Sequence, residues 1–177
     1  MNGNILLRPT KYGMSTVLNH IRVAAPSWKK GATAPTEGFV GLAPVLKFQS
    51  GRLDEASYSL IIPYRMKPGT VINVRVDWCF IAPHAGTVLW KLDYRSVAEG
   101  EDVDGATTEI SKHTAGNHTA DSPLIRTLLD TGIVGAVAHD VLLLHLWRDG
   151  NTDSLVPDAC MVQVHFEYQR DTHGEQS

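Results

Sequence analysis

Two stretches near the C-terminus decide the fold: residues 141–148 read VLLLHLWR, and residues 160–168 read CMVQVHFEY. In the second stretch apolar residues alternate with polar ones, which is the period of a strand with one buried face. The first stretch has three leucines on one face, and its other face, made by Leu143, His145 and Trp147, is also largely apolar. We therefore predict a hairpin of two strands, the first of which lies inside a sheet and is covered on both faces.

The composition is that of a single globular domain. Of the 177 residues 43% are hydrophobic, and the formal net charge is −3. No apolar run approaches the roughly 20 residues of a membrane span. A nucleic-acid partner is not expected either, because such proteins normally present a basic face. The sequence thus predicts one domain that binds neither membrane nor nucleic acid.

The N-terminal residues and the cysteines bear on the compartment. Residues 1–14 place their basic side chains after a three-residue apolar patch, an order that does not match a secretory signal. Cys79 lies in the polar phase of its predicted strand and Cys160 in the apolar phase of its own, so we predict that they do not pair. Unpaired thiols fit a reducing compartment, and we expect synthesis in the cytoplasm.

The first quarter of the chain lacks regular periodicity. Prolines and glycines interrupt residues 1–44 too often for a long helix or strand. Residues 15–23 could form a short helix or strand, and residues 5–8 a short strand. We predict an extended N-terminal arm over residues 1–44 that lies across the domain or a neighbouring chain, and we assign residues 45–177 to the folded domain.

From residue 45 onward the pattern becomes one of short alternating runs. The clearest covers residues 72–80, and we expect it to pair as an antiparallel hairpin with residues 87–94. Residues 124–130 read as a strand or a short helix. The predicted strands are centred near residues 47, 60, 76, 91, 108, 127, 144 and 164. This pattern predicts an all-β fold, a two-sheet antiparallel sandwich of about eight strands of the jelly-roll type.

The eight histidines raise the possibility of a metal site. A cupin-type metalloenzyme would use two histidines two residues apart on a strand, with a carboxylate and a third histidine. The chain contains no His-x-His. His145 and His165 could meet across the predicted hairpin beside Glu167, but His165 and Glu167 lie in the polar phase of their strand. We therefore predict no metal and no cofactor.

Motifs of covalent catalysis and phosphate binding are absent from the sequence. There is no Gly-x-Ser-x-Gly elbow and no glycine-rich loop between a strand and a helix. We interpret the acidic pairs Glu99/Asp102 and Asp149/Asp153 as solvated loop residues rather than a glycosidase pair or, with Asp158, a calcium site. We therefore predict that the protein is not an enzyme.

A set of short segments carries a resemblance to a known family. They are Ile62-Pro63, Lys67-Pro68-Gly69-Thr70, Asp77-Trp78, residues 86–94, Leu146-Trp147-Arg148-Asp149, residues 164–168 and residues 171–174. Through them, residues 45–174 resemble a family of jelly-roll virion proteins of tailed bacteriophages and prophages. Family members often have Pro-His and His-x-His where this chain has Pro63-Tyr64 and residues 74–77, so no metal role is carried over.

The resemblance implies a capsid cement or decoration protein. Such a protein would bind across subunits of the major capsid protein, would associate with itself as a homotrimer rather than a dimer, and would lie on the virion surface after assembly in the bacterial cytoplasm. An exposed apolar surface marks a binding interface. We expect the intersubunit contacts to involve Leu143, His145, Trp147, Ile5, Leu6, Leu7 and Trp28.

Two alternatives remain open. The first is a receptor- or carbohydrate-binding module of a head or tail fibre that uses the loops at residues 81–86, 97–122 and 149–159. These loops contain no Trp or Tyr for stacking on a sugar ring. The second is a cupin-like metalloprotein.

Overall fold

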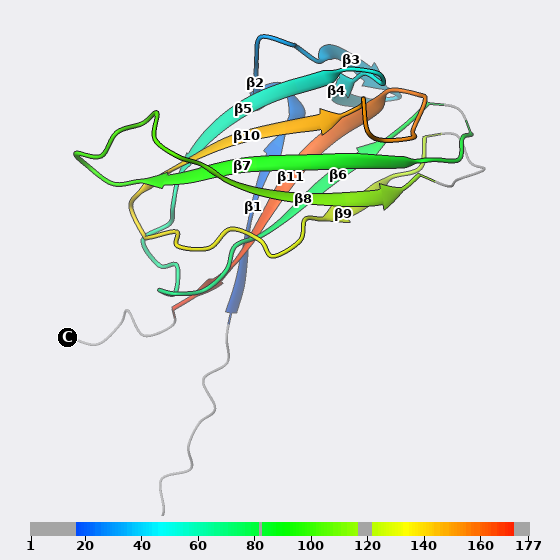
Figure 1. The fold of residues 1–177 in the computed structure, drawn as a ribbon. Coiled ribbons are helices and arrows are strands. Elements are labelled where there is room, and N and C mark those ends of the chain that lie inside the picture. The colour runs from blue at the N-terminus through cyan, green and yellow to red at the C-terminus, as the bar shows by residue number, and fades with distance from the viewer. Residues whose placement is uncertain (1–16, 82, 117–121, 172–177) are drawn as a thin grey trace, which may run out of the picture.

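The computed structural model describes residues 17–81, 83–116 and 122–171, which form a sandwich of two antiparallel sheets (Figure 1). Sheet A contains β1 (Val17–Ala24), β3 (Thr36–Val40), β4 (Ala43–Phe48), β6 (Asn73–Cys79), β9 (Ile125–Leu128) and β11 (Ala159–Arg170). Sheet B contains β2 (Lys29–Lys30), β5 (Leu53–Ile61), β7 (Thr87–Val97), β8 (Thr108–Ala115) and β10 (Val141–Asp149). A short 3-10 helix, η1 (Ala25–Ser27), carries the chain from β1 in sheet A to β2 in sheet B.

The strand order is that of a jelly roll. From β4 to β11, successive strands lie in opposite sheets, with the exception of β7 and β8, and the orders are β4-β11-β6-β9 and β5-β10-β7-β8. This interleaving of two four-stranded layers is the jelly-roll arrangement. The predicted fold class is confirmed, and each of the eight predicted strand centres lies within a strand.

The two predicted hairpins are wrong. β10 pairs with β5 and β7 in sheet B, whereas β11 pairs with β1, β4 and β6 in sheet A. β6 and β7 likewise lie in different sheets. The loops after β6 and β10 are long enough to cross the roughly 10 Å between packed sheets, and alternation within a strand does not say which sheet the strand joins.

The predicted N-terminal arm is corrected for residues 17–44. β1 pairs with β11 over eight residues, from Val17 opposite Arg170 to Ala24 opposite Gln163, and it occupies the edge of β11 that β4 leaves open. Trp28, 3% exposed, fills the core next to Tyr58. The boundary drawn after residue 44 falls inside β4, and residues 1–16 lie outside the described residues. This segment is therefore part of the sandwich itself, and its residues Val23, Ala25 and Trp28 are buried in the core.

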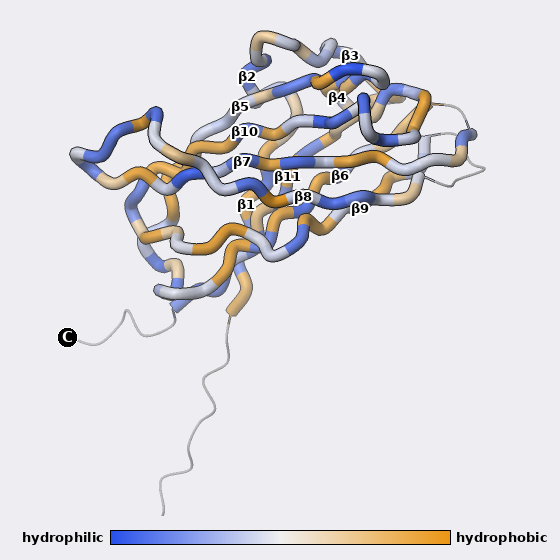
Figure 2. Tube along the Cα trace, viewed as in Figure 1, coloured by the Kyte–Doolittle hydropathy of each residue, from blue (hydrophilic) through white to orange (hydrophobic). Residues whose placement is uncertain are grey.

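The core lies between the sheets. Trp78 and Trp90 meet edge to face with ring centroids 6.2 Å apart, and Phe48 packs edge-on against Trp90 at 5.0 Å. Along the strands of both layers hydrophobic residues alternate with hydrophilic ones (Figure 2), as expected when one face of each sheet covers a core. Within the described ranges no helix is long and apolar enough to cross a membrane.

A β-bulge changes the phase of β11. The register with β6 shifts between Met161 and Gln163, so Met161 is fully buried in the core while Cys160 turns to the outer face of sheet A. The prediction that Cys160 shares a face with Val164 is therefore wrong. Cys160 lies directly opposite Cys79, so the prediction that the cysteines occupy different faces is wrong as well.

Candidate functional site

The outer face of sheet B carries three rows of side chains across β5, β10 and β7. Because residues opposite each other on antiparallel strands point to the same face, the register defines these rows. Leu143 lies between Ser59 and Arg95; the next two rows are Ser57, His145 and Asp93, and Glu55, Trp147 and Lys91. The central strand thus presents mainly apolar groups, and the flanking strands present polar ones.

His145 joins the two flanking strands. Its Nε2 lies 2.9 Å from Oε2 of Glu55, and its Nδ1 lies 3.6 Å from Oδ2 of Asp93. Burial acts to raise the pKa of Glu55, but the backbone N–H groups of Ala32 and Thr33 and the imidazole outweigh burial, so that this pKa is lowered. Glu55 is accordingly an ionised anchor that holds the imidazole and the segment after β2 against the sheet.

Two glycines allow neighbouring segments of the chain to pack closely against the two sides of this face. A Cβ at Gly31 would lie 2.5 Å from Cγ and Oε1 of Glu55, so the segment after β2 approaches the sheet more closely than a larger residue would allow. On the opposite side, a Cβ at Gly105 in the β7–β8 loop would lie 1.3 Å from Nη1 of Arg95. The loop, at the left of Figure 1, therefore rests against the guanidinium group.

A groove of about 350 Å³ lies between these two sides. We call it the sheet B groove. Its lining combines cationic, hydroxyl, carboxylate and apolar groups. Within the described part of the chain, neither Lys29 nor Arg95 forms an ion pair. A surface of this kind offers hydrogen-bond donors and acceptors around a small apolar centre. The groove is lined by Lys29, Ser57, Tyr58, Ser59, Asp93, Arg95, Val103, Thr107, Leu143, Leu144 and His145.

Trp147 lies one row beyond the groove and is engaged within the chain. The Nζ of Lys91 lies 4.5 Å from the centroid of its ring, in the geometry of a cation–π contact. Lys91 also lies 3.6 Å from Asp149 and 3.8 Å from Glu109. This side chain therefore covers one face of the indole. The predicted cover on both faces of β10 is therefore complete only on the leucine face, since Leu143, His145 and Trp147 are half-buried.

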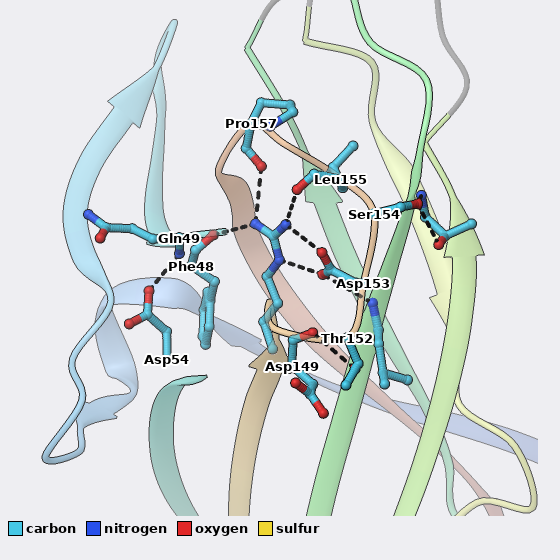
Figure 3. Close-up of polar contacts among 12 residues, drawn as sticks. Phe48, Gln49, Asp54, Asp149, Thr152, Asp153, Ser154, Leu155 and Pro157 are labelled. Carbon is cyan, nitrogen blue, oxygen red and sulfur yellow. Dashed lines mark hydrogen bonds and ion pairs between the residues drawn. The ribbon is translucent and has the colours of Figure 1, made fainter. Parts of the chain in front are cut away.

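Arg148 holds in place the loop that leads from β10 in sheet B to β11 in sheet A. Its guanidinium group is fully buried, and its Nε and Nη2 donate to the two carboxylate oxygens of Asp153 at 2.7 and 3.0 Å. It also donates to the carbonyl oxygens of Phe48, Leu155 and Pro157. Figure 3 shows these acceptors gathered around one point. The prediction that Asp149 and Asp153 are solvated is therefore wrong: Asp149 is buried, and the Asp153 side chain is the buried partner of the arginine.

A second histidine contact lies on the outer face of sheet A. Nε2 of His165 lies 2.8 Å from Nδ1 of His20, and Glu167 lies 3.7 Å from the same Nδ1. His145 and His165 are on different sheets, so the suggested meeting of these two residues does not occur. Among the described residues no group of three or more His, Cys, Asp or Glu is placed to hold a metal ion.

The predicted interface residues fall into three groups. Leu143 and His145 line the sheet B groove, and Trp147 lies beside it. Trp28 is a core residue, which corrects its assignment to an interface. Ile5, Leu6 and Leu7 lie outside the described residues. Of the three loops suggested for sugar binding, the one from 97 to 122 contributes Val103 and Thr107 to the groove.

Other lining residues were not anticipated from the sequence. For Ser57 and Ser59 the available signal is their alternation with Tyr58 and Leu60, which marks them only as the polar phase of a strand. Lys29 and Arg95 had no such signal, because the groove depends on two loops that pack against the sheet through glycines.

Comparison with known proteins yields structural similarities alone. No protein-family model matches the sequence, and no curated protein does. A CBM36-1 domain of a multidomain xylanase from the hindgut metagenome of Trinervitermes trinervoides is 12% identical, with a TM-score of 0.44 over 84% of this chain and 96% of that one. Dimeric latent PorU from Porphyromonas gingivalis is 11% identical, with a TM-score of 0.47 over 88% of this chain and 13% of that one.

A third structure, TmCBM61 in complex with beta-1,4-galactotriose, is 12% identical, with a TM-score of 0.40 over 81% of this chain and 87% of that one. Similarity at this level leaves the function of the present chain to be argued from its own residues.

Proposed function

We propose that this protein is a carbohydrate-binding module and that the sheet B groove is its site. The jelly roll itself does not discriminate, because viral capsid, lectin and cupin domains all use it. The observation that supports the proposal is the groove between Gly31 and Gly105, in which hydroxyl and charged groups surround an apolar floor.

The chemistry of the groove matches that of a sugar. A pyranose presents hydroxyl groups that both donate and accept hydrogen bonds around its rim, and it presents C–H groups on its faces. Ser57 and Ser59 can serve as donors or acceptors, Asp93 as an acceptor and Arg95 as a donor. Leu143 supplies apolar contact at the centre. Recognition here would rest on hydrogen bonding, since the indole of Trp147 lies outside the groove and is partly covered by Lys91.

The arrangement of the carboxylates favours binding over hydrolysis. A glycosidase places two carboxyl groups on either side of the scissile bond. In this groove the imidazole of His145 occupies the space between Glu55 and Asp93 and contacts both. Both ring nitrogens are thereby engaged, and neither the bond to be cleaved nor an attacking water has a place between the two acids.

A panel of soluble oligosaccharides tests the proposal, with the best binder then measured by titration calorimetry. Replacing Arg95 by glutamine removes a charged donor, and because such hydrogen bonds contribute about 1.5–3 kcal/mol, the affinity should fall about 10- to 100-fold. The matched control is Arg22→Gln, which removes an exposed arginine from the outer face of sheet A and should leave affinity unchanged. If no glycan is retained, or if both variants bind equally well, the proposal is wrong.

A capsid cement function is the second candidate, and a different surface favours it. The β3–β4 hairpin displays Phe39 at 69% and Leu42 at 99% exposure. Apolar side chains exposed to this degree on a hairpin are suited to docking on a protein such as a major capsid protein. The double variant Phe39→Ser/Leu42→Ser should then lose binding to undecorated heads, while Val156→Ser, at a site 68% exposed in another loop, should retain it. Equal binding by both variants would reject this candidate.

A further inference from the structure

Cys79 and Cys160 face each other across two adjacent strands of sheet A. They are partners in the antiparallel register of β6 and β11, they are both free thiols, and their exposures are 4% and 0%. Opposed residues in antiparallel strands have Cα atoms about 4.5 or about 5.5 Å apart, depending on the type of pair. Both values lie within the range of about 4.4–6.8 Å found in disulfides. The backbone therefore already has the spacing that a bridge requires.

We propose that Cys79 and Cys160 form a reversible modification site, which a disulfide reagent such as oxidised glutathione converts into a cross-strand disulfide. The inference is independent of the sheet B groove, which lies on the other sheet. The site exists because the bulge after Met161 turns Cys160 outward; without that shift its side chain would enter the core.

The reaction is a thiol–disulfide exchange in two steps. The thiolate of Cys79 attacks one sulfur of the reagent, expels the first thiolate and forms a mixed disulfide. Cys160 gives its proton to solvent, attacks the Cys79 sulfur and expels the second thiolate. The reagent is reduced to two thiols, and the protein loses two hydrogen atoms as its sulfurs join.

The contact between the thiols assigns the order of attack. The neighbouring Cys160 thiol lowers the pKa of Cys79 and outweighs burial, which raises it. The same contact, together with burial, raises the pKa of Cys160. Thiolates rather than thiols are the nucleophiles, so Cys79 attacks first.

Access to the pair depends on the edge of sheet A. The cysteines pack with Val45 and with the partly buried Val40, Ala43 and Val162, so the β3–β4 hairpin forms part of their cover. β4 is joined to β11 through three residue pairs, from Ala159 opposite Phe48 to Met161 opposite Leu46. A short edge pairing of this kind opens locally more readily than the centre of a sheet, and such opening admits the reagent.

The test uses the full chain, reduced and then incubated with graded ratios of oxidised to reduced glutathione. Intact mass should fall by two hydrogen atoms per monomer, and the Tm should rise by about 5–15 °C, since a bridge between distant residues restricts the unfolded chain. Dithiothreitol should reverse both changes. Cys160→Ser should accumulate a glutathione adduct on Cys79, whereas Cys79→Ser should remain largely unmodified.

Three results would overturn the proposal. The folded protein could keep two thiols under conditions that oxidise the same chain in denaturant, it could form only disulfide-linked dimers, or the adduct could form on Cys160 in preference to Cys79. If a serine variant fails to fold, brief alkylation of the reduced wild type followed by peptide mapping supplies the same comparison. Faster labelling of Cys79 supports the assignment, and faster labelling of Cys160 contradicts it.

Discussion

Replacing Arg148 by methionine would test how the chain is held where it crosses from sheet B to sheet A. Methionine keeps a long apolar stem but removes every donor of the guanidinium group. Asp153, whose side chain is 1% exposed, would lose its bidentate partner and keep only a contact of 3.4 Å from the backbone N–H of Leu89. The carbonyl groups of Phe48, Leu155 and Pro157 would lose their donor as well.

The size of the effect follows from the burial of the charge that is left behind. Removing one partner of a buried ion pair costs about 3–5 kcal/mol, because the other charge remains in a low-dielectric site. For a domain of this length each kcal/mol lowers Tm by about 2–4 °C, so we expect a loss of about 6–20 °C. A second substitution, Asp153→Leu, should restore part of this stability, because it removes the unpaired charge and leaves only the carbonyl groups unsatisfied.

Urea unfolding followed by tryptophan fluorescence measures these differences, provided that the m-value stays constant across the variants. The four proteins of the cycle are the wild type, Arg148→Met, Asp153→Leu and the double variant. Arg22→Met is the control, since substitution of an exposed arginine should change the stability by no more than about 0.5 kcal/mol. Our reasoning is refuted if Arg148→Met costs less than about 1 kcal/mol, or if adding Asp153→Leu makes the single variant less stable.

Two further predictions concern the two outer faces. Gly105→Ala should displace the guanidinium of Arg95 and weaken glycan binding several-fold in calorimetry. The Tm should stay within a few degrees of the wild type, because the displaced group is the end of a flexible side chain. Undiminished binding would contradict the proposed contact. Burial and the neighbouring His20, Arg22 and Arg75 lower the pKa of His165 from 6.5, whereas Asp77 raises it. The contribution of His165 to stability should be complete above pH 6.5 and should be lost as the pH falls through the lowered pKa. The difference in urea midpoint between the wild type and His165→Gln should therefore change over that pH interval. A difference that stays constant would exclude this role.

Much of the local structure was predictable because a strand declares itself within a few residues. The eight predicted strand centres all lie within jelly-roll strands, although the pattern of residues 124–130 also allowed a short helix. Alternation correctly separated the leucine face of β10 from the face with Leu143 and His145. It failed at the bulge after Met161, where one extra residue reverses the phase without any signal in the composition. The consequence was the wrong placement of Cys160.

Strand pairing and the groove were beyond the reach of local pattern. The backbone of a strand can form its hydrogen bonds with any neighbouring strand of suitable length. Proximity in sequence therefore suggested hairpins at two places where the chain of the jelly roll crosses from one sheet to the other. Residues 17–44 looked irregular because prolines and glycines divide them into short strands. In the structure β1 pairs with the free edge of β11, and Trp28 is buried in the core, so this segment belongs to the sandwich.

The sequence by itself determined that the chain forms short antiparallel strands, that these build a two-layer jelly roll, and which residues of most strands face the core, because conformation and burial follow from neighbours two residues away. The tertiary structure alone decided which strands meet, that Lys29, Asp93, Arg95 and His145 share one groove, and that Cys79 and Cys160 stand opposite each other. These juxtapositions join residues far apart in the chain, and they depend on register, a bulge and close approaches at glycine, none of which a local pattern encodes.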